Sequence, residues 1–166
     1  TLHLAAQMQN KGQLIALDIY ESKLKKLKKR ARRNGVHNME TRVIDSNKVI
    51  KKLHNSADRL LLDAPCSGLG VIKRNPDSKW KLEPEFVERI MGVQQDILQN
   101  YSKMVKKGGQ MVYATCSILP QENSEQVKTF LESENGKDFE FVKEQNIYAS
   151  ETGFDGFYMA LLKKKA

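Results

Sequence analysis

Four short apolar runs, separated by helical patterns, constrain the fold of this chain more than any other feature. The runs cover residues 12–19 (GQLIALDI), 39–45 (METRVID), 57–63 (ADRLLLD) and 109–116 (GQMVYATC). Strands that alternate with helices are typical of an α/β fold with a mostly parallel sheet covered by helices on both faces. Ligands of such sheets bind at the carboxyl ends of the strands. We therefore expect Asp18, Asp45, Asp63 and Cys116, which stand at these ends, to converge on one rim.

Helical patterns fill the segments between the strands, and a closing hairpin follows them. We expect helices over residues 2–9, 23–33, 48–54, 85–106 and 122–133, and an antiparallel hairpin from FEFVKE and GFYMALLKKK. The residue after a helix often takes a left-handed conformation, which favours glycine. Gly35 and the pair Gly108 and Gly109 stand at such positions. Residues 64–84 form the longest connection, and long loops inside compact domains are usually functional or disordered.

The net charge of +8 and the pI near 9.4 favour a polyanionic partner. Residues 23–33 (KLKKLKKRARR) carry eight basic residues around Leu24, Leu27 and Ala31, a spacing that predicts an amphipathic helix. Its basic face either contacts RNA or is simply solvated.

We find no apolar run long enough for a membrane span and no leader at the start. We expect one cytoplasmic domain over residues 1–166, monomeric and without a metal. The two cysteines indicate reduced thiols, with a disulfide between them as the alternative.

Two motifs place a cysteine directly after an apolar strand: DAPCSGLG over residues 63–70 and ATCSILPQEN over residues 114–123. With these motifs the chain resembles the Sun and NOP2-like family of RNA 5-methylcytosine methyltransferases. The resemblance runs from TLHLAAQM at the start to DGFYMALL at the end. It implies a Rossmann-like catalytic domain that uses S-adenosyl-L-methionine (SAM) to methylate cytosine in structured RNA, with ribosomal RNA as the expected substrate.

The chemistry of this methylation explains why two thiols are needed. C5 of cytosine is a poor nucleophile, so a thiolate must first add to C6 and push electron density onto C5. The C5 proton must then leave before the sulfur is expelled, which requires a second group. The resemblance assigns the attack to Cys116 and the release to Cys66. Attack also places charge around N3 of the ring, which a protonated or shared-proton carboxyl would relieve, and the matching residue is Asp63. The alternative for each cysteine is a small buried apolar residue.

The resemblance also implies the cofactor and RNA contacts. Asp18 and Asp45 would bind the ribose and adenine side of SAM, and Asp63 would bridge cofactor and base; strand-end aspartates otherwise cap the following helix. In the segment VIKRNPDSKW, the residues expected to meet RNA phosphates are Lys73, Arg74 and Lys79. Trp80 either stacks on a base or anchors the loop. Phe157 and Tyr158, in the closing motif, are expected to pack in a strand.

The chain departs from the family at its start. Family members carry, before the position of Thr1, a first strand and a glycine-rich turn that holds the methionine part of SAM. We therefore expect an amino-terminally truncated domain whose sheet lacks a middle strand. For the chain alone we expect weak SAM binding and no activity.

Two other functions stay open. One is a DNA cytosine-5 methyltransferase, although its nucleophile lies in the Pro-Cys motif and it needs no Thr-Cys partner. The other is a catalytically silent RNA-binding scaffold.

Overall fold

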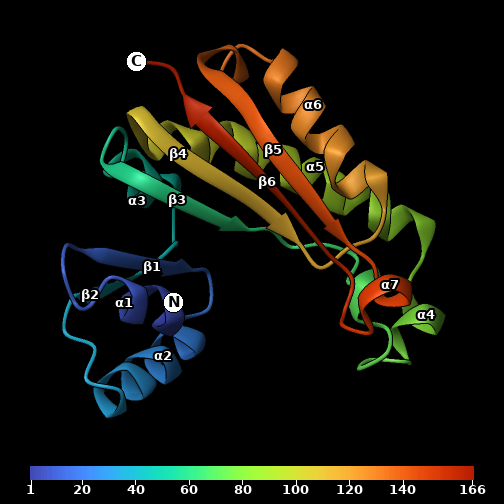
Figure 1. The fold of residues 1–166 in the computed structure, drawn as a ribbon, viewed down its shortest axis with the longest axis horizontal. Helices are drawn as coiled ribbons and strands as arrows, with labels where there is room; N and C mark the ends of the chain where they lie inside the picture. Colours follow the sequence, from blue (N-terminus) through green and yellow to red (C-terminus); the bar gives the residue numbers. More distant parts are fainter. The chain divides into compact units, whose positions relative to one another are not determined.

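The computed structural model describes residues 1–166, and the chain forms two compact parts, Thr1–Lys52 and Leu53–Ala166 (Figure 1). Its strands form two hydrogen-bonded sheets, and β1 and β3 do not pair with each other. No helix in either part combines the length and the apolar character that crossing a membrane requires.

The first part contains two parallel strands and three helices. β1 (Leu14–Asp18) pairs with β2 (Met39–Val43), and the helices are α1 (Leu2–Gln7), α2 (Glu21–Arg33) and α3 (Asn47–Lys51). The predicted amphipathic helix is confirmed: Leu24 and Ala31 of α2 are buried, Leu27 is half-buried, and all eight basic residues are exposed.

The end of α2 follows the predicted glycine signal. Gly35 has a φ of +63°. Its N–H donates to the carbonyl of Arg32, and the N–H of Val36 donates to the carbonyl of Ala31. This paired pattern closes a helix with a left-handed residue, which glycine adopts without steric cost.

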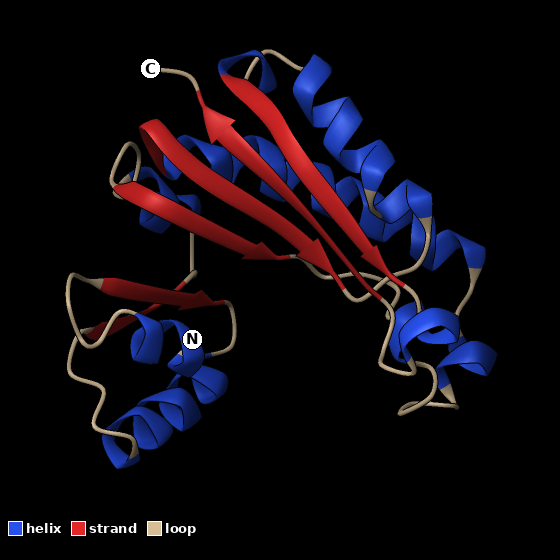
Figure 2. Ribbon diagram, viewed as in Figure 1, coloured by secondary structure: helices blue, strands red, loops and turns tan.

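The second part is built on a four-stranded sheet in the order β3-β4-β6-β5 (Figure 2). β3 (Ala57–Asp63) runs parallel to β4 (Val105–Thr115), while β6 (Phe157–Lys164) pairs antiparallel with both β4 and β5 (Phe139–Ile147). The antiparallel pairing of β5 with β6 confirms the predicted closing hairpin, although a short helix, α7 (Ala149–Thr152), lies in its connection.

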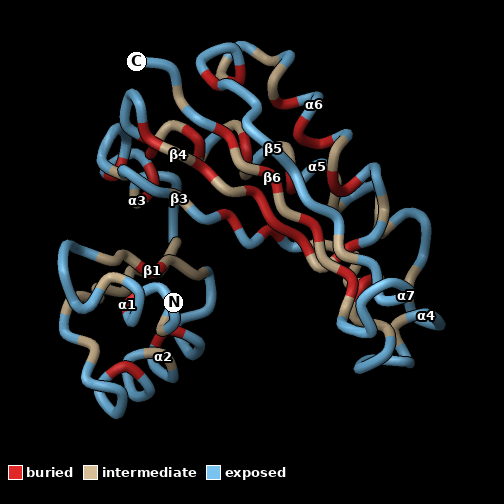
Figure 3. The backbone as a smooth tube through the Cα atoms, in the orientation of Figure 1, coloured by how far each residue is buried: buried red, intermediate tan, exposed pale blue.

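Two helices, α5 (Pro84–Tyr101) and α6 (Ser124–Glu132), pack on the same face of this sheet (Figure 2). Leu98 of α5 and Phe130 of α6 are fully buried with Met111, Tyr113 and Leu162 of the strands. Along β6 buried and partly exposed residues alternate, as expected for a strand with one face on the core. Figure 3 shows the buried residues concentrated along β4 and β6, the two central strands of this sheet. The predicted packing of Tyr158 in this strand is confirmed.

The helix predicted over residues 85–106 is shorter in the structure. The helix ends at Tyr101, a 3₁₀ turn (Ser102–Met104) follows, and β4 begins at Val105. Between β3 and β4 the register shifts from Ala57 opposite Val105 to Arg59 opposite Gln110. Gly108, at a φ of +74°, belongs to this bulge and not to a helix end. Bulges favour glycine at such a position, which explains why the glycine signal was misread.

Candidate active site at the ends of strands β3 and β4

Parallel pairing of β3 with β4 sets the two cysteine motifs side by side. Asp63, the last residue of β3, lies opposite Ala114 of β4, and the N–H of Ala64 donates to the carbonyl of Ala114 at 2.9 Å. The two chains therefore leave the sheet at the same edge. Their loops carry Cys66 and Cys116, as the sequence predicted for the carboxyl ends of neighbouring parallel strands.

The two thiols are in direct contact. The Sγ atoms of Cys66 and Cys116 lie 3.3 Å apart, and both residues are free and half-buried. A disulfide bond measures about 2.05 Å, so the structure holds two separate thiols and the disulfide alternative does not describe it. A separation of 3.3 Å suits a hydrogen bond from one sulfur to the other.

This contact shifts the pKa values of the two thiols in opposite directions. A hydrogen bond from Cys66 lowers the pKa of the Cys116 thiol to about 7, against the opposing effect of burial. The same hydrogen bond, followed by burial, raises the pKa of the Cys66 thiol. At neutral pH Cys116 therefore has substantial thiolate character while Cys66 keeps its proton. The thiolate is the nucleophilic form of cysteine.

Asp63 is exposed at the end of β3. Its negative charge raises the pKa of the Cys116 thiol, as a smaller contribution than the hydrogen bond from Cys66. Asp63 therefore lies within electrostatic range of the thiol pair. Its charge therefore does not help to ionise Cys116.

Beneath the thiols lies a buried carboxylate that the sequence reasoning missed. Glu122 is fully buried and accepts hydrogen bonds from the backbone N–H of Ser67 (2.7 Å), the hydroxyl of Ser67 (2.5 Å) and the amide of Gln94 (3.1 Å). The hydroxyl of Ser117 also donates to it. Each serine directly follows one of the cysteines. The repeated Cys-Ser pair, together with a glutamate in ATCSILPQEN, was the only signal in the sequence.

Backbone contacts also join these loops to the closing motif GFDGFYM. The N–H of Gly70 donates to the carbonyl of Cys116 at 2.9 Å, and the N–H of Gly156 donates to the carbonyl of Gly70 at 2.7 Å. A Cβ added to Gly70 would lie 2.2 Å from the carbonyl oxygen of Gly156. Only glycine fits at this position, which is why the Pro-Cys motif continues with it.

The residues predicted to meet RNA lie in the connection between β3 and α5. Arg74 forms an ion pair with Asp155 at 2.7 Å, and Lys73 lies 3.4 Å from the carbonyl of Gly153. Lys79 lies over the ring of Trp80, 4.7 Å from its centroid, and Trp80 is 80% exposed. Trp80 therefore does not anchor the loop in a core. Its ring is available for stacking.

In the first part, Asp18 and Asp45 follow the adjacent strands β1 and β2. Asp18 Oδ1 accepts from the N–H of Tyr20 at 2.8 Å, and Asp18 Oδ2 lies 3.8 Å from Lys23. Asp45 accepts from the hydroxyl of Ser46 at 3.0 Å. Asp18 thus braces the turn before α2 but does not cap the helix, because the N-cap residue is Tyr20 and no side chain caps it. Each carboxylate nevertheless keeps an oxygen that can accept from a hydroxyl, so the donor chemistry of a ribose fits both.

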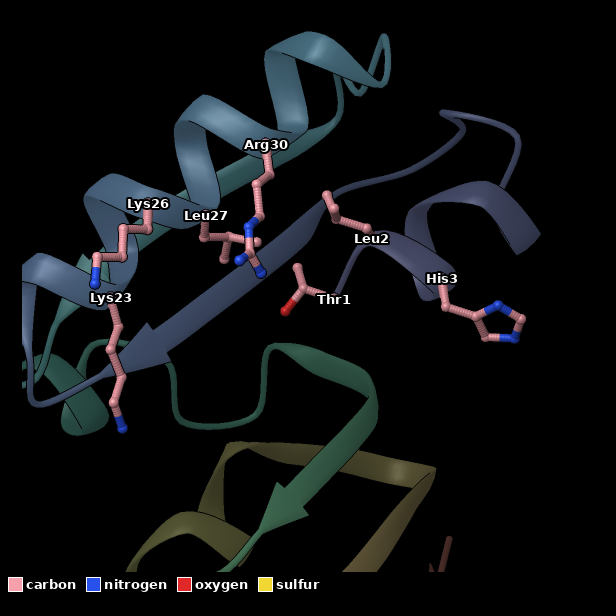
Figure 4. Close-up of a pocket in the computed structure, with 7 residues that line it drawn as sticks. All are labelled: Thr1, Leu2, His3, Lys23, Lys26, Leu27 and Arg30. Atoms are coloured by element: carbon pink, nitrogen blue, oxygen red, sulfur yellow. The ribbon is translucent and has the colours of Figure 1, made fainter. Parts of the chain in front are cut away.

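A separate pocket of about 470 Å³ in the first part lies beside α1 and α2 (Figure 4). The residues that line it are Thr1, Leu2, His3, Lys23, Lys26, Leu27 and Arg30. Its charged side chains are basic, and it contains none of the predicted site residues. It is therefore distinct from the cysteine pair.

Comparison with known proteins decides the family. The model of the 16S rRNA methyltransferase RsmB/F family matches residues 1–163. The chain belongs to this family. The resemblance to Sun-type enzymes that the two cysteine motifs suggested is therefore confirmed.

Two curated relatives from bacteria match nearly the whole chain. The chain is 35% identical to a probable ribosomal RNA small subunit methyltransferase B of Bacillus subtilis, over 98% of this chain and 40% of the relative. It is 39% identical to the ribosomal RNA small subunit methyltransferase B of Yersinia enterocolitica, over 93% of this chain and 37% of the relative. The chain thus spans about two fifths of the length of these relatives.

Solved structures place the fold among SAM-dependent methyltransferases. NSun6 from Pyrococcus horikoshii, solved with the SAM analogue SFG, matches with a TM-score of 0.86 and 28% identity, over 99% of this chain and 44% of that one. The predicted Rossmann-like α/β class is confirmed.

Proposed function

We propose that this chain carries the catalytic centre of a SAM-dependent methyltransferase that modifies C5 of cytosine in small-subunit ribosomal RNA. One observation supports this proposal above the others: the 3.3 Å contact between Cys66 and Cys116. Methylation at C5 through a covalent intermediate needs one thiol to attack and a second group to assist release. A pair of free thiols in contact, at the ends of adjacent parallel strands, supplies both.

The difference in pKa between the two thiols supports a separate role for each. Cys116, with a pKa lowered to about 7, adds to C6 of the ring, forming an S–C6 bond and moving the C5–C6 electron pair onto C5. SAM, when bound, supplies the methyl group that C5 then takes. Asp63, protonated or sharing its proton with N3, would stabilise the charge that attack places on the ring, since an ionised carboxylate would repel it. In a DNA-type mechanism Cys66 would attack, but the Cys66 thiol holds its proton more tightly.

Release depends on a change at Cys66 that attack itself brings about. Once the Cys116 sulfur is bonded to carbon, it is no longer an anion and no longer a strong acceptor. The two effects of Cys116 that raise the pKa of Cys66, hydrogen bonding and charge, are then removed. Cys66 can lose its proton to solvent and take the proton from C5. The electron pair of that C–H bond re-forms the C5–C6 double bond, and Cys116 leaves as a thiolate.

The remaining predicted residues would hold cofactor and RNA. The carboxylates of Asp18 and Asp45 suit the ribose hydroxyls of SAM, with Asp18 Oδ2 accepting from one of them beside its 3.8 Å contact with Lys23. Lys73, Arg74 and Lys79 would meet RNA phosphates, and the exposed ring of Trp80 offers a face for a base. The names of the bacterial relatives support ribosomal RNA of the small subunit as the substrate.

The proposal is tested by trapping the covalent intermediate in the full-length protein given SAM and its RNA. Cys116→Ala removes the attacking sulfur, so neither product nor adduct should form. Cys66→Ala leaves the attacking sulfur in place, and above about pH 8.5, where Cys116 ionises even without the hydrogen bond from Cys66, attack and methyl transfer proceed while elimination stalls, so a protein–RNA adduct should accumulate on a denaturing gel. The double variant is the matched control and should show no adduct. An adduct with Cys116→Ala would reverse the two roles, and no adduct with Cys66→Ala would contradict the covalent mechanism.

A further inference from the structure

We propose that Glu122 is a positioning residue that holds the Cys66 and Cys116 loops at their contact distance by accepting hydrogen bonds from both. This inference rests on the proposed function, because it gives the thiol contact a structural cause. Nothing in the reaction scheme uses Glu122, and yet this ionisable side chain is fully buried next to the two thiols.

The hydrogen bonds of Glu122 connect the two loops to each other. One oxygen accepts from the backbone N–H of Ser67 and from Gln94, and the other accepts from the hydroxyls of Ser67 and Ser117. Gln94 also donates to the carbonyl of Pro65, at 2.9 Å. The loop that carries Cys66 is therefore fixed at positions on both sides of the cysteine, at Pro65 and Ser67.

The loop that carries Cys116 is fixed from the same centre. Besides the bond from Ser117 to Glu122, the amide of Asn123 donates to the carbonyl of Ser117 at 3.0 Å, and the hydroxyl of Thr115 donates to Asn123 at 2.5 Å. The hydroxyl oxygens of Ser67 and Ser117 lie 3.2 Å apart. The two Cys-Ser pairs are thus in contact at two places, sulfur to sulfur and hydroxyl to hydroxyl, and both hydroxyls donate to Glu122.

Glu122 acts here through geometry and not through its charge. Its negative charge raises the pKa of the Cys116 thiol, as a minor contribution, so the charge opposes the thiolate that attack requires. What favours the thiolate is the hydrogen bond from Cys66, which needs the two sulfurs to stay in contact. A buried acceptor that satisfies several donors holds its surroundings rigidly, and this rigidity is the contribution of Glu122.

The closing experiment measures thiol proximity directly and needs neither SAM nor RNA. The oxidant diamide joins two neighbouring thiols by taking two hydrogens as the S–S bond forms. In the full-length protein, Glu122→Ala should slow formation of the Cys66–Cys116 disulfide by about tenfold, because the loops lose their common acceptor. Alkylation of Cys116 at pH 7 should slow about tenfold as well, as its pKa returns toward the ordinary cysteine range. Glu125→Ala removes an exposed carboxylate of the same segment and should change neither rate.

A conservative variant separates geometry from charge. In Glu122→Gln the amide oxygen can still accept from the N–H of Ser67, and the amide nitrogen can donate to the two hydroxyls, which rotate to accept. Both rates should then stay within about threefold of the wild type. Rates as slow as those of Glu122→Ala would overturn the geometric explanation.

A second variant, Ser117→Ala, tests the same network with a smaller change. If Glu122→Ala does not fold, as judged by circular dichroism, Ser117→Ala removes a single hydroxyl link and should still slow both rates. Unchanged rates in a folded Glu122→Ala or Ser117→Ala would overturn the proposal. If the wild-type protein shows no methyl transfer, the proposed function fails, while the thiol measurements still judge Glu122 independently.

Discussion

Replacing Gly70 with alanine should disrupt the joint between the two cysteine loops and the closing motif. The added Cβ would lie 2.2 Å from the carbonyl oxygen of Gly156 and 2.7 Å from that of Cys116. Both neighbours are backbone atoms, so neither can turn aside as a flexible side chain does. Overpacking costs about 1–3 kcal/mol. Moving the segments apart also weakens the two backbone hydrogen bonds of Gly70, at about 1 kcal/mol each.

We therefore expect Gly70→Ala to lower the free energy of unfolding by about 3–5 kcal/mol. Urea denaturation measures this, and with a slope of about 1.5 kcal/mol per molar the midpoint should fall by about 2–3 M. Gly92→Ala is the matched control. Gly92 lies exposed in α5 with nothing within 4 Å of the added Cβ, so the same change there should stabilise the helix by about 1 kcal/mol. A Gly70→Ala midpoint equal to that of the wild type would refute the reasoning, because the close approach of the three segments would then be absent in solution.

Two further predictions concern the thiols and the RNA. With a pKa lowered to about 7, the thiolate of Cys116 should be present above pH 7 and lost below it, so the rate of its alkylation by iodoacetamide should be half-maximal near pH 7. Cys66→Ala removes the donor and should move this midpoint up toward about 8.5; an unmoved midpoint would show that the contact does not activate Cys116. Charge reversal at both Lys73 and Arg74 should weaken RNA binding and flatten its dependence on salt, measured by fluorescence anisotropy at several ionic strengths. If affinity and salt slope both stay unchanged, these side chains face solvent and do not contact phosphates.

Local patterns in the sequence were enough to predict the strands and the cysteine pair. Apolar runs that end in Asp18, Asp63 or Cys116 mark parallel strands, and parallel pairing brings strand ends together without any knowledge of side-chain contacts. The contact of Cys66 with Cys116 follows from that rule and from the two motifs.

Features that depend on contacts between distant residues could not be predicted in this way. Glu122 bonds to Ser67 across 55 positions, and a glutamate near a helix start is ordinarily read as a first-turn residue. The bulge at Gly108 depends on how β3 and β4 shift against each other, whereas the glycine alone suits a helix end equally well. Likewise, nothing in VIKRNPDSKW indicates that Arg74 pairs with Asp155.

The backbone joint at Gly70 also bears on the order in which the molecule can assemble. Gly70, Cys116 and Gly156 come from segments far apart in the chain, and the joint between them consists of main-chain atoms alone. Contacts between distant segments form late, because the intervening chain must first be ordered. The joint at Gly70 can therefore close only after the segment of Gly156, which leads into β6, has been made. The contact between the two thiols, by contrast, is set by the pairing of β3 with β4 and by Glu122, and it does not require this segment.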